Sequence, residues 1–278
     1  MTFQSMFGKP KAIIAMAHFP AMPGQPLHDA RGGVAALVDA VRHDVEILAE
    51  SGVDAVMFCN EGDRPYRTQA GPEVPAVMAA AITEIKRDLE LPFGVDILWD
   101  PVAAIALARA VGAAFVREVF TGAYAGDFGI WNTDPAAALE YRRKIGADAV
   151  KLFFNVTAEF AAPVAPREIG LTARSAVFSS LADAVCVSGV VTGTGVDLAD
   201  LAAAKEAVDG AVPVIANTGV SPATVGEILS VADGCIVGTA LKRDGNTWNE
   251  VDADRVTRFV AAAAESGEWD PRPAGVAA

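Results

Sequence analysis

Short apolar runs alternate with longer amphipathic segments along the whole chain. Each run is rich in β-branched or aromatic residues, and a loop and an Ala-rich segment with helical spacing follow it, so the pattern predicts a strand and then a helix each time. This rhythm occurs eight times. The predicted strands are residues 12–17, 55–59, 93–98, 114–119, 149–154, 184–187, 212–216 and 235–237.

The first predicted helix shows how its segments are patterned. Its apolar positions, which recur at steps of three and four, are Val34, Leu37, Val38, Val41, Val45 and Leu48. The polar positions between them are Asp39, Arg42, Asp44 and Glu46. This spacing predicts one buried stripe and one polar face. Later helices have capping signals at their starts, which are Asp134 before Pro135, Asp197 before Leu198, and Ser221 before Pro222.

The predicted strands are continuously apolar, which is typical of a parallel sheet that is buried on both faces. Eight β/α units predict an α/β fold of the TIM-barrel type, a closed (β/α)₈ barrel. A doubly wound sheet usually has a Gly-rich turn after its first strand, and residues 18–24 lack the G-x-G-x-x-G pattern. We expect a single domain over residues 1–278, with an N-terminal extension at 1–10 and a poorly ordered tail at 267–278.

The composition narrows the class of protein. With 278 residues, 52% of them hydrophobic and 21% charged, the chain can bury a large core and is not typical of a disordered protein. Lys and Arg number 22 against 35 Asp and Glu, which gives a net charge of −13. This charge argues against a nucleic-acid partner, because a phosphate backbone attracts basic surfaces.

The cysteines and the N-terminus indicate where the protein works. Cys59, Cys186 and Cys235 lie far apart in apolar runs, so we expect reduced core thiols rather than disulfides. The first eleven residues lack the apolar core of a signal peptide, and no apolar stretch reaches the roughly 20 residues that cross a bilayer. The sequence therefore predicts a cytoplasmic protein without a membrane partner.

Charged and polar residues at the predicted strand ends indicate the chemistry. The outer faces of barrel strands are covered by helices, so a charge within a strand points inward or lies at the strand end, and active sites of such barrels lie at the C-terminal ends of the strands. The predicted catalytic residues are Lys151, Glu61, Asp96, Glu118, His18 and Arg117. The predicted substrate-binding residues are Asn60, Asp63, Arg64, Trp99, Asn155, Ser188, Thr192, Gly193, Asn217, Gly219, Gly238 and Thr239.

Lys151 is the most suggestive single residue, because it lies in an otherwise apolar predicted strand. It is interpreted as a lysine that binds the substrate phosphate or performs Schiff-base or proton-transfer chemistry. The alternative is a structural ion pair with Asp96 or Glu118 in the barrel interior. His18 is either a general acid or base or a structural histidine, while His43 is expected on the surface and His28 in a loop.

Several acidic residues are expected around one half of the mouth. Carboxylates that lie close together raise one another's pKa unless a cation lies among them. That cation is either a basic side chain of the same mouth or a divalent ion such as Mg²⁺. Two of the acids also have structural interpretations, with Asp100 as a helix cap before Pro101 and Asp63 as a turn residue.

Glycines follow the last two predicted strands. Gly219 and Gly238 lie just past strands seven and eight, where TIM barrels form phosphate sites from backbone N–H groups, and Thr239 comes directly after Gly238. The small residues of the 188–195 loop would lie on the same rim. The alternative is that both glycines are ordinary turn residues. We expect a phosphorylated ligand, because such a ligand would explain these amide groups despite the acidic overall charge.

Distinctive residue groups are spread over residues 9–259. They are His18 with Pro23-Gly24, Cys59 to Tyr66, Leu98 to Pro101, Arg117 to Gly122, Asp127 with Gly129 and Trp131, Lys151 to Asn155, Ser188-Gly189, Thr192-Gly193, and Val237 to Lys242. In these residues the chain resembles the BtpA/SgcQ family, and its SgcQ branch more closely. The resemblance implies a phosphate-binding (β/α)₈ barrel.

The resemblance implies two different settings. BtpA is associated with photosystem I accumulation, whereas SgcQ-like members accompany genes of sugar uptake and metabolism. Where BtpA-type sequences tend to have Glu-Asn after the second strand, this chain has Cys59-Asn60 and then Glu61, and Asp96 replaces an Asn of the third strand. These differences argue against the photosystem role and favour an acidic, enzyme-like mouth.

The leading hypothesis is an enzyme of sugar metabolism, an isomerase, epimerase or aldolase-like lyase acting on a small phosphorylated sugar or a related nucleotide-sugar fragment. The alternatives are a non-catalytic assembly or regulatory factor and a metal-dependent hydrolase of phosphate esters or nucleotides. Exposed apolar residues at 124–131 either seal the site of a neighbour in a homo-oligomer, act as a lid, or fold over their own barrel.

Overall fold

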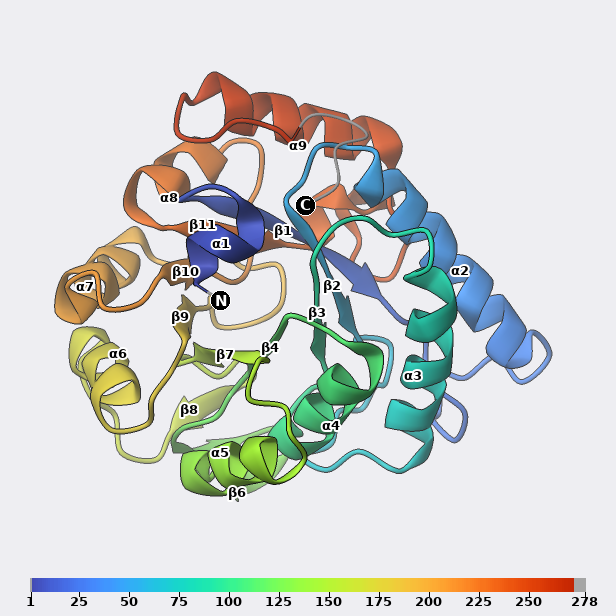
Figure 1. Cartoon of the computed structure of the whole chain (residues 1–278), viewed down its shortest axis with the longest axis horizontal. Coiled ribbons are helices and arrows are strands. Elements are labelled where there is room, and N and C mark those ends of the chain that lie inside the picture. The colour runs from blue at the N-terminus through green and yellow to red at the C-terminus, as the bar shows by residue number, and fades with distance from the viewer. Residues whose placement is uncertain (1, 273–278) are drawn as a thin grey trace.

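Eight parallel strands close into a barrel in the computed structural model, which describes residues 2–272 (Figure 1). The strands are β1 (Ala12–His18), β2 (Ala55–Cys59), β3 (Phe93–Asp96), β4 (Phe115–Glu118), β7 (Lys151–Asn155), β9 (Ala184–Val187), β10 (Val214–Ala216) and β11 (Gly234–Val237). Their order around the barrel is β1-β11-β10-β9-β7-β4-β3-β2. All eight predicted strands are present, so the TIM barrel is confirmed and the open sheet is wrong.

Within residues 2–272, eight helices surround the barrel. They are α2 (Gly33–Ala49), α3 (Glu73–Ile85), α4 (Pro101–Val111), α5 (Pro135–Lys144), α6 (Ile169–Phe178), α7 (Leu198–Val208), α8 (Val225–Val231) and α9 (Ala253–Glu265). Asp134 and Asp197 cap α5 and α7 as predicted. The start predicted at Ser221 is wrong, because the backbone N–H of Ser221 donates to the Thr224 hydroxyl in a turn and α8 begins only at Val225.

Side chains alternate between two buried layers along each strand. In β1, Ile13 and Ala15 face the helices, while Ile14 and Met16 fill the barrel interior. Phe115 and Phe153 also fill the interior, and their rings stack at 4.6 Å. Both layers are apolar, which explains why the strands lack polar alternation. The three cysteines are buried and free, as expected.

The N-terminal end of the barrel is covered by a short helix, α1 (Phe3–Phe7), which lies across the end that faces the viewer in Figure 1. Phe7 is 1% exposed, and its ring packs edge-on against Phe115 at 6.1 Å. The segment that the sequence marked only as an extension therefore closes this end of the barrel, and a ligand has access at the opposite end.

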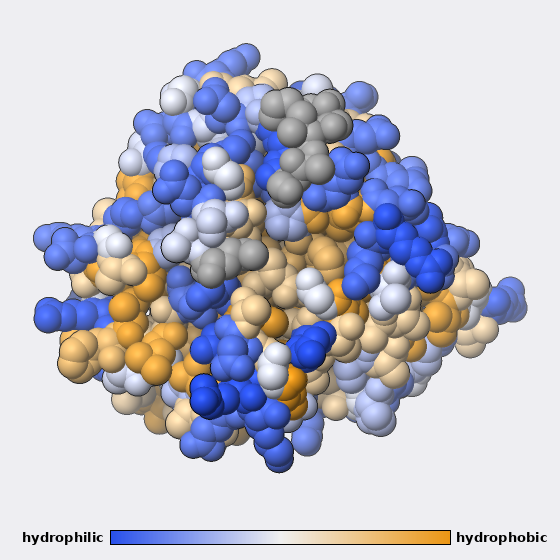
Figure 2. Space-filling model, viewed as in Figure 1, coloured by the Kyte–Doolittle hydropathy of each residue, from blue (hydrophilic) through white to orange (hydrophobic). Residues whose placement is uncertain are grey.

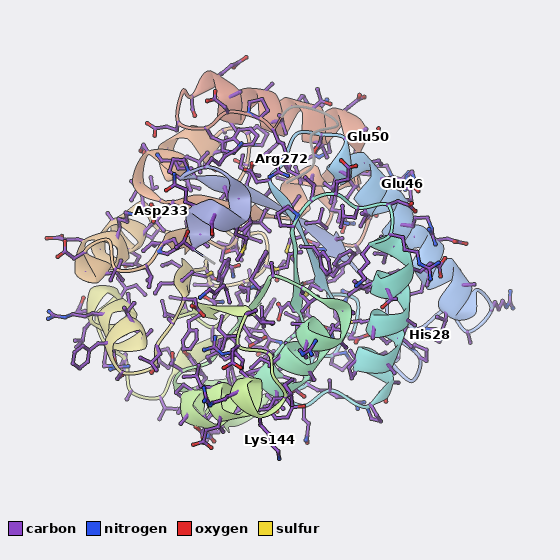
Figure 3. The ribbon with its side chains drawn as sticks, in the orientation of Figure 1. His28, Glu46, Glu50, Lys144, Asp233 and Arg272 are labelled. Atoms are coloured by element: carbon purple, nitrogen blue, oxygen red, sulfur yellow. The ribbon has the colours of Figure 1, made fainter. Side chains whose placement is uncertain are left out.

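Aspartates brace this N-terminal end. Asp54, Asp183 and Asp233 directly precede β2, β9 and β11, and each accepts the backbone N–H of a residue in the neighbouring strand. Each of them also pairs with a lysine, which is Lys9, Lys151 and Lys205 respectively. Figure 3 shows Asp233 on the side of the barrel that α1 covers.

A small antiparallel sheet was not predicted. It consists of β5 (Ala123–Gly126), β6 (Gly129–Asn132) and β8 (Ala161–Pro163) in the order β6-β5-β8. Its residue Trp131 is buried, with its ring 5.6 Å from that of Trp99. The 124–131 segment thus packs over its own barrel through Trp131, while Ile130 of the same segment is 83% exposed.

The start of the C-terminal tail is packed rather than poorly ordered. The Trp269 ring is buried, and its Nε1 donates to Oδ2 of Asp54 at 2.6 Å. The backbone of Arg272 donates to Gly52. The expectation for 267–278 is therefore wrong for residues 267–272, while 273–278 lie outside the described residues.

The surface mixes hydrophilic and hydrophobic residues, with hydrophobic ones visible beside α6 and α7 in Figure 2. Phe178, at the end of α6, is 85% exposed, and Leu181 is 63% exposed. Within residues 2–272, none of the helices has the length and hydropathy needed to cross a membrane.

Candidate active site

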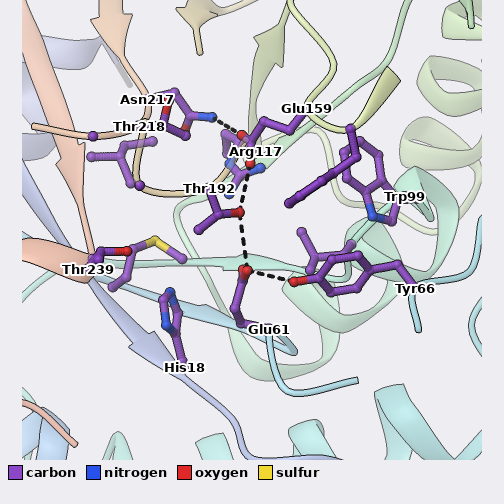
Figure 4. Close-up of a pocket in the computed structure, with 17 residues that line it drawn as sticks. His18, Glu61, Tyr66, Trp99, Arg117, Glu159, Thr192, Asn217, Thr218 and Thr239 are labelled. Atoms are coloured by element: carbon purple, nitrogen blue, oxygen red, sulfur yellow. Dashed lines mark hydrogen bonds between the residues drawn. The ribbon is translucent and has the colours of Figure 1, made fainter. Parts of the chain in front are cut away.

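A pocket opens at the C-terminal end of the barrel, opposite α1 (Figure 4). The pocket together with the open space at its mouth measures about 490 Å³. Its lining comes from the ends of most barrel strands and the loops after them. The lining residues are Met16, His18, Glu61, Tyr66, Leu98, Trp99, Arg117, Glu159, Phe160, Thr192, Gly193, Asn217, Thr218, Gly219, Ile236, Gly238 and Thr239.

Three of the predicted catalytic residues, His18, Glu61 and Arg117, line this pocket. Two more, Asp96 and Glu118, lie behind it at the ends of β3 and β4. Oδ2 of Asp96 is 3.1 Å from Nη2 of Arg117. Five side chains from the ends of four strands, β1 to β4, therefore lie together at the mouth, where active sites of such barrels form.

Lys151 is not at the mouth, and its predicted placement there is wrong. It is the first residue of β7, at the end of the barrel that α1 covers, and its Nζ lies 2.7 Å from Oδ1 of Asp183. Asn155, at the other end of β7, is four residues away, which is about 13 Å of strand. Lys151 therefore forms a structural ion pair, although with Asp183 rather than with Asp96 or Glu118.

Arg117 is the central cation of the site. Its side chain is buried among carboxyl groups. Burial by itself lowers the pKa of Arg117, but the charges of Asp96 and Glu159 raise it further than burial lowers it, so the guanidinium stays charged. Burial raises the pKa of Asp96 to about 6, although Arg117 opposes this change. Burial and the charge of Asp96 raise the pKa of Glu118 well above its usual value.

Glu159, which the sequence analysis missed, provides a second carboxyl group inside the pocket. It lies in the loop after β7, it is 7% exposed, and burial raises its pKa to about 7. Its Oε2 accepts a hydrogen bond from the Thr192 hydroxyl at 3.1 Å, and Nδ2 of Asn217 lies 3.4 Å from its Oε1. At neutral pH this carboxyl group can therefore both release and accept a proton.

Glu61 lies across the pocket from Glu159, as Figure 4 shows. Its Oε1 accepts a hydrogen bond from the Tyr66 hydroxyl at 2.8 Å and lies 3.4 Å from the hydroxyl of Thr192. The Thr192 hydroxyl thus joins the two carboxyl groups of Glu61 and Glu159. A ligand between them would contact two acids that share one hydrogen-bond network.

His18 ends β1 on the same side of the pocket as Gly238. Burial, and then the positive charge of Lys242, lower the pKa of His18 well below its usual value. The imidazole is therefore neutral at pH 7, and it can donate one hydrogen bond and accept another. His28 instead bonds the backbone oxygen of Ala21, and His43 is exposed, as expected.

Backbone amides form the side of the pocket opposite Tyr66 and Trp99, and we call this side the amide wall. Gly193, Gly219, Gly238 and Thr239 all line it. Gly219 has a φ of +63°, and a Cβ there would lie 2.1 Å from the backbone N of Gly195, so only glycine fits. The N–H groups of Gly193, Gly219 and Thr239 have no hydrogen-bond partner among residues 2–272. Gly219 and Thr239 lie after the seventh and eighth barrel strands, as predicted, where TIM barrels bind phosphate, and Gly193 lies in the loop after the sixth.

Other predicted binding residues support the site from outside the pocket lining. Asn60 and Asp63 bond each other at 2.9 Å, and they also accept the N–H groups of Leu98 and Met22. They fix loops and do not line this pocket, so a binding role for them stays a prediction.

Asn155 and Ser188 also lie behind the wall. Nδ2 of Asn217 donates to the Ser188 hydroxyl at 2.6 Å, and that hydroxyl donates to Oδ1 of Asn155 at 3.1 Å. This chain of hydrogen bonds holds the Asn217 amide toward Glu159. Asn155 and Ser188 therefore position a pocket residue rather than line the pocket themselves.

Arg64 lies in an adjacent cavity that shares His18 and Glu61 with the main pocket. Its guanidinium carbon lies 3.3 Å from the ring centroid of Trp248, which is a cation–π contact. Asp100 caps α4 and is structural, as its alternative interpretation held. Within residues 2–272, no three or more His, Cys, Asp or Glu side chains form a group that could hold a metal ion.

Glu159, Tyr66 and Phe160 were not among the predicted site residues. Glu159 lies four residues beyond the end of β7, whereas the site residues were sought at the strand ends themselves. The one available signal was the single acid in the otherwise uncharged stretch from Asn155 to Ala165. Tyr66 lies inside the distinctive 59–66 group but was not assigned a role.

Comparison with known proteins agrees with the geometry. The sequence model of the BtpA family matches residues 9–265. The putative sgc region protein SgcQ of Escherichia coli is 46% identical over 92% of this chain and 96% of its own length. The photosystem I biogenesis protein BtpA of Synechocystis sp. is 31% identical over 93% of this chain and 90% of its own. The greater likeness to SgcQ confirms the predicted branch.

A solved structure with the same fold is N-(5′-phosphoribosyl)anthranilate isomerase from Pyrococcus furiosus. It superposes with a TM-score of 0.55 at 14% sequence identity, covering 92% of this chain and 99% of that one. This likeness supports the TIM barrel.

Proposed function

The chain belongs to the BtpA family, and we propose that it is an enzyme that binds a small phosphorylated sugar or a related metabolite and moves a proton at one of its carbon atoms. One observation carries the proposal. The backbone N–H groups of Gly219 and Thr239, which have no partner among residues 2–272, line the same pocket as the Glu159 carboxyl group, whose pKa burial raises to about 7.

The phosphate would lie against the amide wall. Backbone N–H groups that converge without internal partners are suited to an anion, and glycine lets the ligand approach the backbone closely. A phosphate bound there would leave the rest of the ligand between Glu61 and Glu159. The phosphoribosyl ligand in the name of the solved neighbour is consistent with this class of substrate.

Glu159 would act as the general acid or base. A carboxyl group with a pKa of about 7 is well matched to proton transfer at neutral pH. Removing a proton from a carbon next to a carbonyl leaves negative charge on oxygen, and the buried Arg117 guanidinium is placed to stabilise that charge. Glu61 and the neutral His18 can carry the proton to a second atom of the ligand.

Isomerase or epimerase chemistry fits better than Schiff-base lyase chemistry. Among the described residues that line the pocket there is no lysine, and Lys151 is paired with Asp183 at the other end of the barrel. The aldolase-like alternative with a lysine nucleophile therefore loses its nucleophile. A non-catalytic assembly role would leave the amide wall and the Glu159 carboxyl group without a chemical task.

Proton exchange at carbon tests the proposal without requiring the product to be known. The protein would be incubated in D₂O with a panel of aldose and ketose phosphates, and loss of carbon-bound proton signals would be followed by ¹H NMR. We expect exchange on at least one phosphate, loss of at least 100-fold in rate for Glu159→Gln, and no loss for the exposed Glu140→Gln control. Absence of both exchange and binding over the panel would contradict the proposal and favour an assembly role.

A further inference from the structure

Three aromatic side chains form one side of the pocket, which we call the aromatic wall. Tyr66, Trp99 and Phe160 line the pocket, and their rings are neighbours, with centroids 6.5 Å apart for Tyr66 and Trp99 and 5.7 Å apart for Tyr66 and Phe160. Phe128 supports the wall from behind, 5.0 Å from Trp99. A sugar phosphate alone does not require so much aromatic surface.

The backbone of Trp99 is held in an unusual conformation. Its φ is +67°, a region that bulky side chains rarely adopt, and its N–H donates to Oε1 of Glu118 at 2.6 Å. Glu118, which accepts this hydrogen bond, is buried and lies behind the pocket together with Asp96. Strained residues of this kind gather at functional sites, because the surrounding structure must hold them in place.

Trp99 also has an unused donor. Its indole Nε1 is buried and has no hydrogen-bond partner among residues 2–272, although buried tryptophans usually find one. Packing of the core alone does not explain a lining residue with both a strained backbone and an unpaired N–H group. A ligand with a flat face would account for the aromatic lining, and a hydrogen-bond acceptor at its edge would pair with the indole N–H group.

The two ends of the pocket differ in chemistry. Figure 4 shows Tyr66 and Trp99 on one side, Thr218 and Thr239 on the other, and Glu61 with Glu159 between them. From these positions we infer that the substrate carries a planar aromatic or heterocyclic ring besides its phosphate, with the ring held against the aromatic wall. The reacting part of the substrate then lies between its ring and its phosphate, beside the carboxyl groups of Glu61 and Glu159.

This inference rests on the proposed function, because the phosphate must occupy the amide wall for the ring to reach the aromatic one. The competing explanation is that the aromatic wall packs against the sugar itself. Matched ligands separate the two. Ribose 5-phosphate has the phosphate and the sugar, and the purine and pyrimidine nucleoside 5′-monophosphates add only a ring.

The test is isothermal titration calorimetry with these ligands on the full chain. We expect at least one nucleoside monophosphate to bind about tenfold or more tightly than ribose 5-phosphate, since stacking of a base on an aromatic side chain has an effect of this order. Trp99→Gly, which tolerates the positive φ, should abolish that gain and leave ribose 5-phosphate affinity within about twofold. Trp248→Leu, at an exposed tryptophan outside this pocket, serves as the control.

Tyr66→Leu provides a second variant should Trp99→Gly fail to fold, and it should lose the gain as well. If ribose 5-phosphate binds and no ring-bearing ligand binds more tightly, the inference is overturned while the proposed function stands. A gain that persists in every folded variant of the aromatic wall overturns it too. If neither kind of ligand binds, the proposed function fails and the inference fails with it.

Discussion

Lys151 and Asp183 form an ion pair 2.7 Å long at the end of the barrel opposite the pocket. Asp183 also accepts the backbone N–H of Leu152, so the pair ties β9 to β7. Asp54 and Asp233 make the same connection between other strands. The lysine that stands out most in the sequence is therefore one of a repeated set of strand-to-strand braces.

Replacement of Lys151 should affect stability and not chemistry. We expect Lys151→Met to lower the free energy of unfolding by about 1 kcal/mol, because the pair is partly exposed to solvent. Proton exchange should stay within about twofold of the wild type. Urea denaturation and the NMR exchange assay measure the two quantities, with the exposed Lys144→Met as the control. A folded variant that lost exchange would show that Lys151 acts in the site after all.

Glu159 should make stability depend on pH. Its pKa is about 7 in the folded protein and lies near 4.5 in the unfolded chain, so the folded state binds the proton more tightly. Below pH 4.5 the ionisation of this carboxyl group therefore does not lower the free energy of unfolding. As the pH rises from 4.5 toward 7 it lowers that free energy increasingly, and above pH 7 the effect levels off. Glu159→Gln should thus stabilise the protein by about 3 kcal/mol more at pH 8 than at pH 4.5.

Denaturation of the Glu159→Gln variant and the wild type at both pH values provides this measurement. Glu140→Gln, at an exposed position of α5, should show no such difference. Equal effects of Glu159→Gln at pH 4.5 and pH 8 would mean that the Glu159 carboxyl group titrates normally, and its role as the acid or base would then be doubtful.

The positive charge of Arg117 should stabilise the folded protein, because it lies among the buried carboxyl groups of Asp96 and Glu159. We expect Arg117→Met to cost about 3 kcal/mol at pH 7, because Asp96 and Glu159 would lose their buried cation. The cost should be smaller at pH 5, since the pKa of Asp96, already about 6, would rise further without the arginine and the group would be protonated. Urea denaturation at the two pH values tests this, and a cost that does not depend on pH would contradict it.

Gly238 offers a selective change to the amide wall. A Cβ at Gly238 would lie 3.1 Å from Cε1 of His18, so Gly238→Ala should weaken phosphate binding by about tenfold with little loss of stability. Gly170→Ala is the matched control, because its Cβ would also meet an atom at 3.1 Å, the backbone oxygen of Ala203, far from the pocket. Calorimetry with inorganic phosphate compares them. Equal affinities for both variants would place the phosphate elsewhere.

The barrel could be predicted from the sequence because its strands have a strong local signal. All eight strands were found, since each is a continuous apolar run followed by a helical pattern. The β5, β6 and β8 strands were missed because they are short, contain glycine and alanine, and lie largely exposed. Their pairing depends on contacts across the mouth that no local pattern records.

The sequence predicted that His18, Glu61 and Arg117 lie at one mouth of the barrel, but it placed Lys151 there as well. Periodicity gives the face on which a residue lies but not its height along the barrel, which is why Lys151 was placed at the wrong end. It also assigned Asp44 to a polar face, although Asp44 is buried and pairs with Lys242 at 2.5 Å. Glu159 was missed because a loop, rather than a strand, carries it into the pocket.

The most direct test of a phosphate-binding active site at this mouth is a crystal structure of the protein with ribose 5-phosphate. We predict that the phosphate lies within hydrogen-bond distance of the N–H groups of Gly219 and Thr239, with the sugar between Glu61 and Glu159. A phosphate bound at Arg64 or elsewhere, with these amides facing only water, would contradict it.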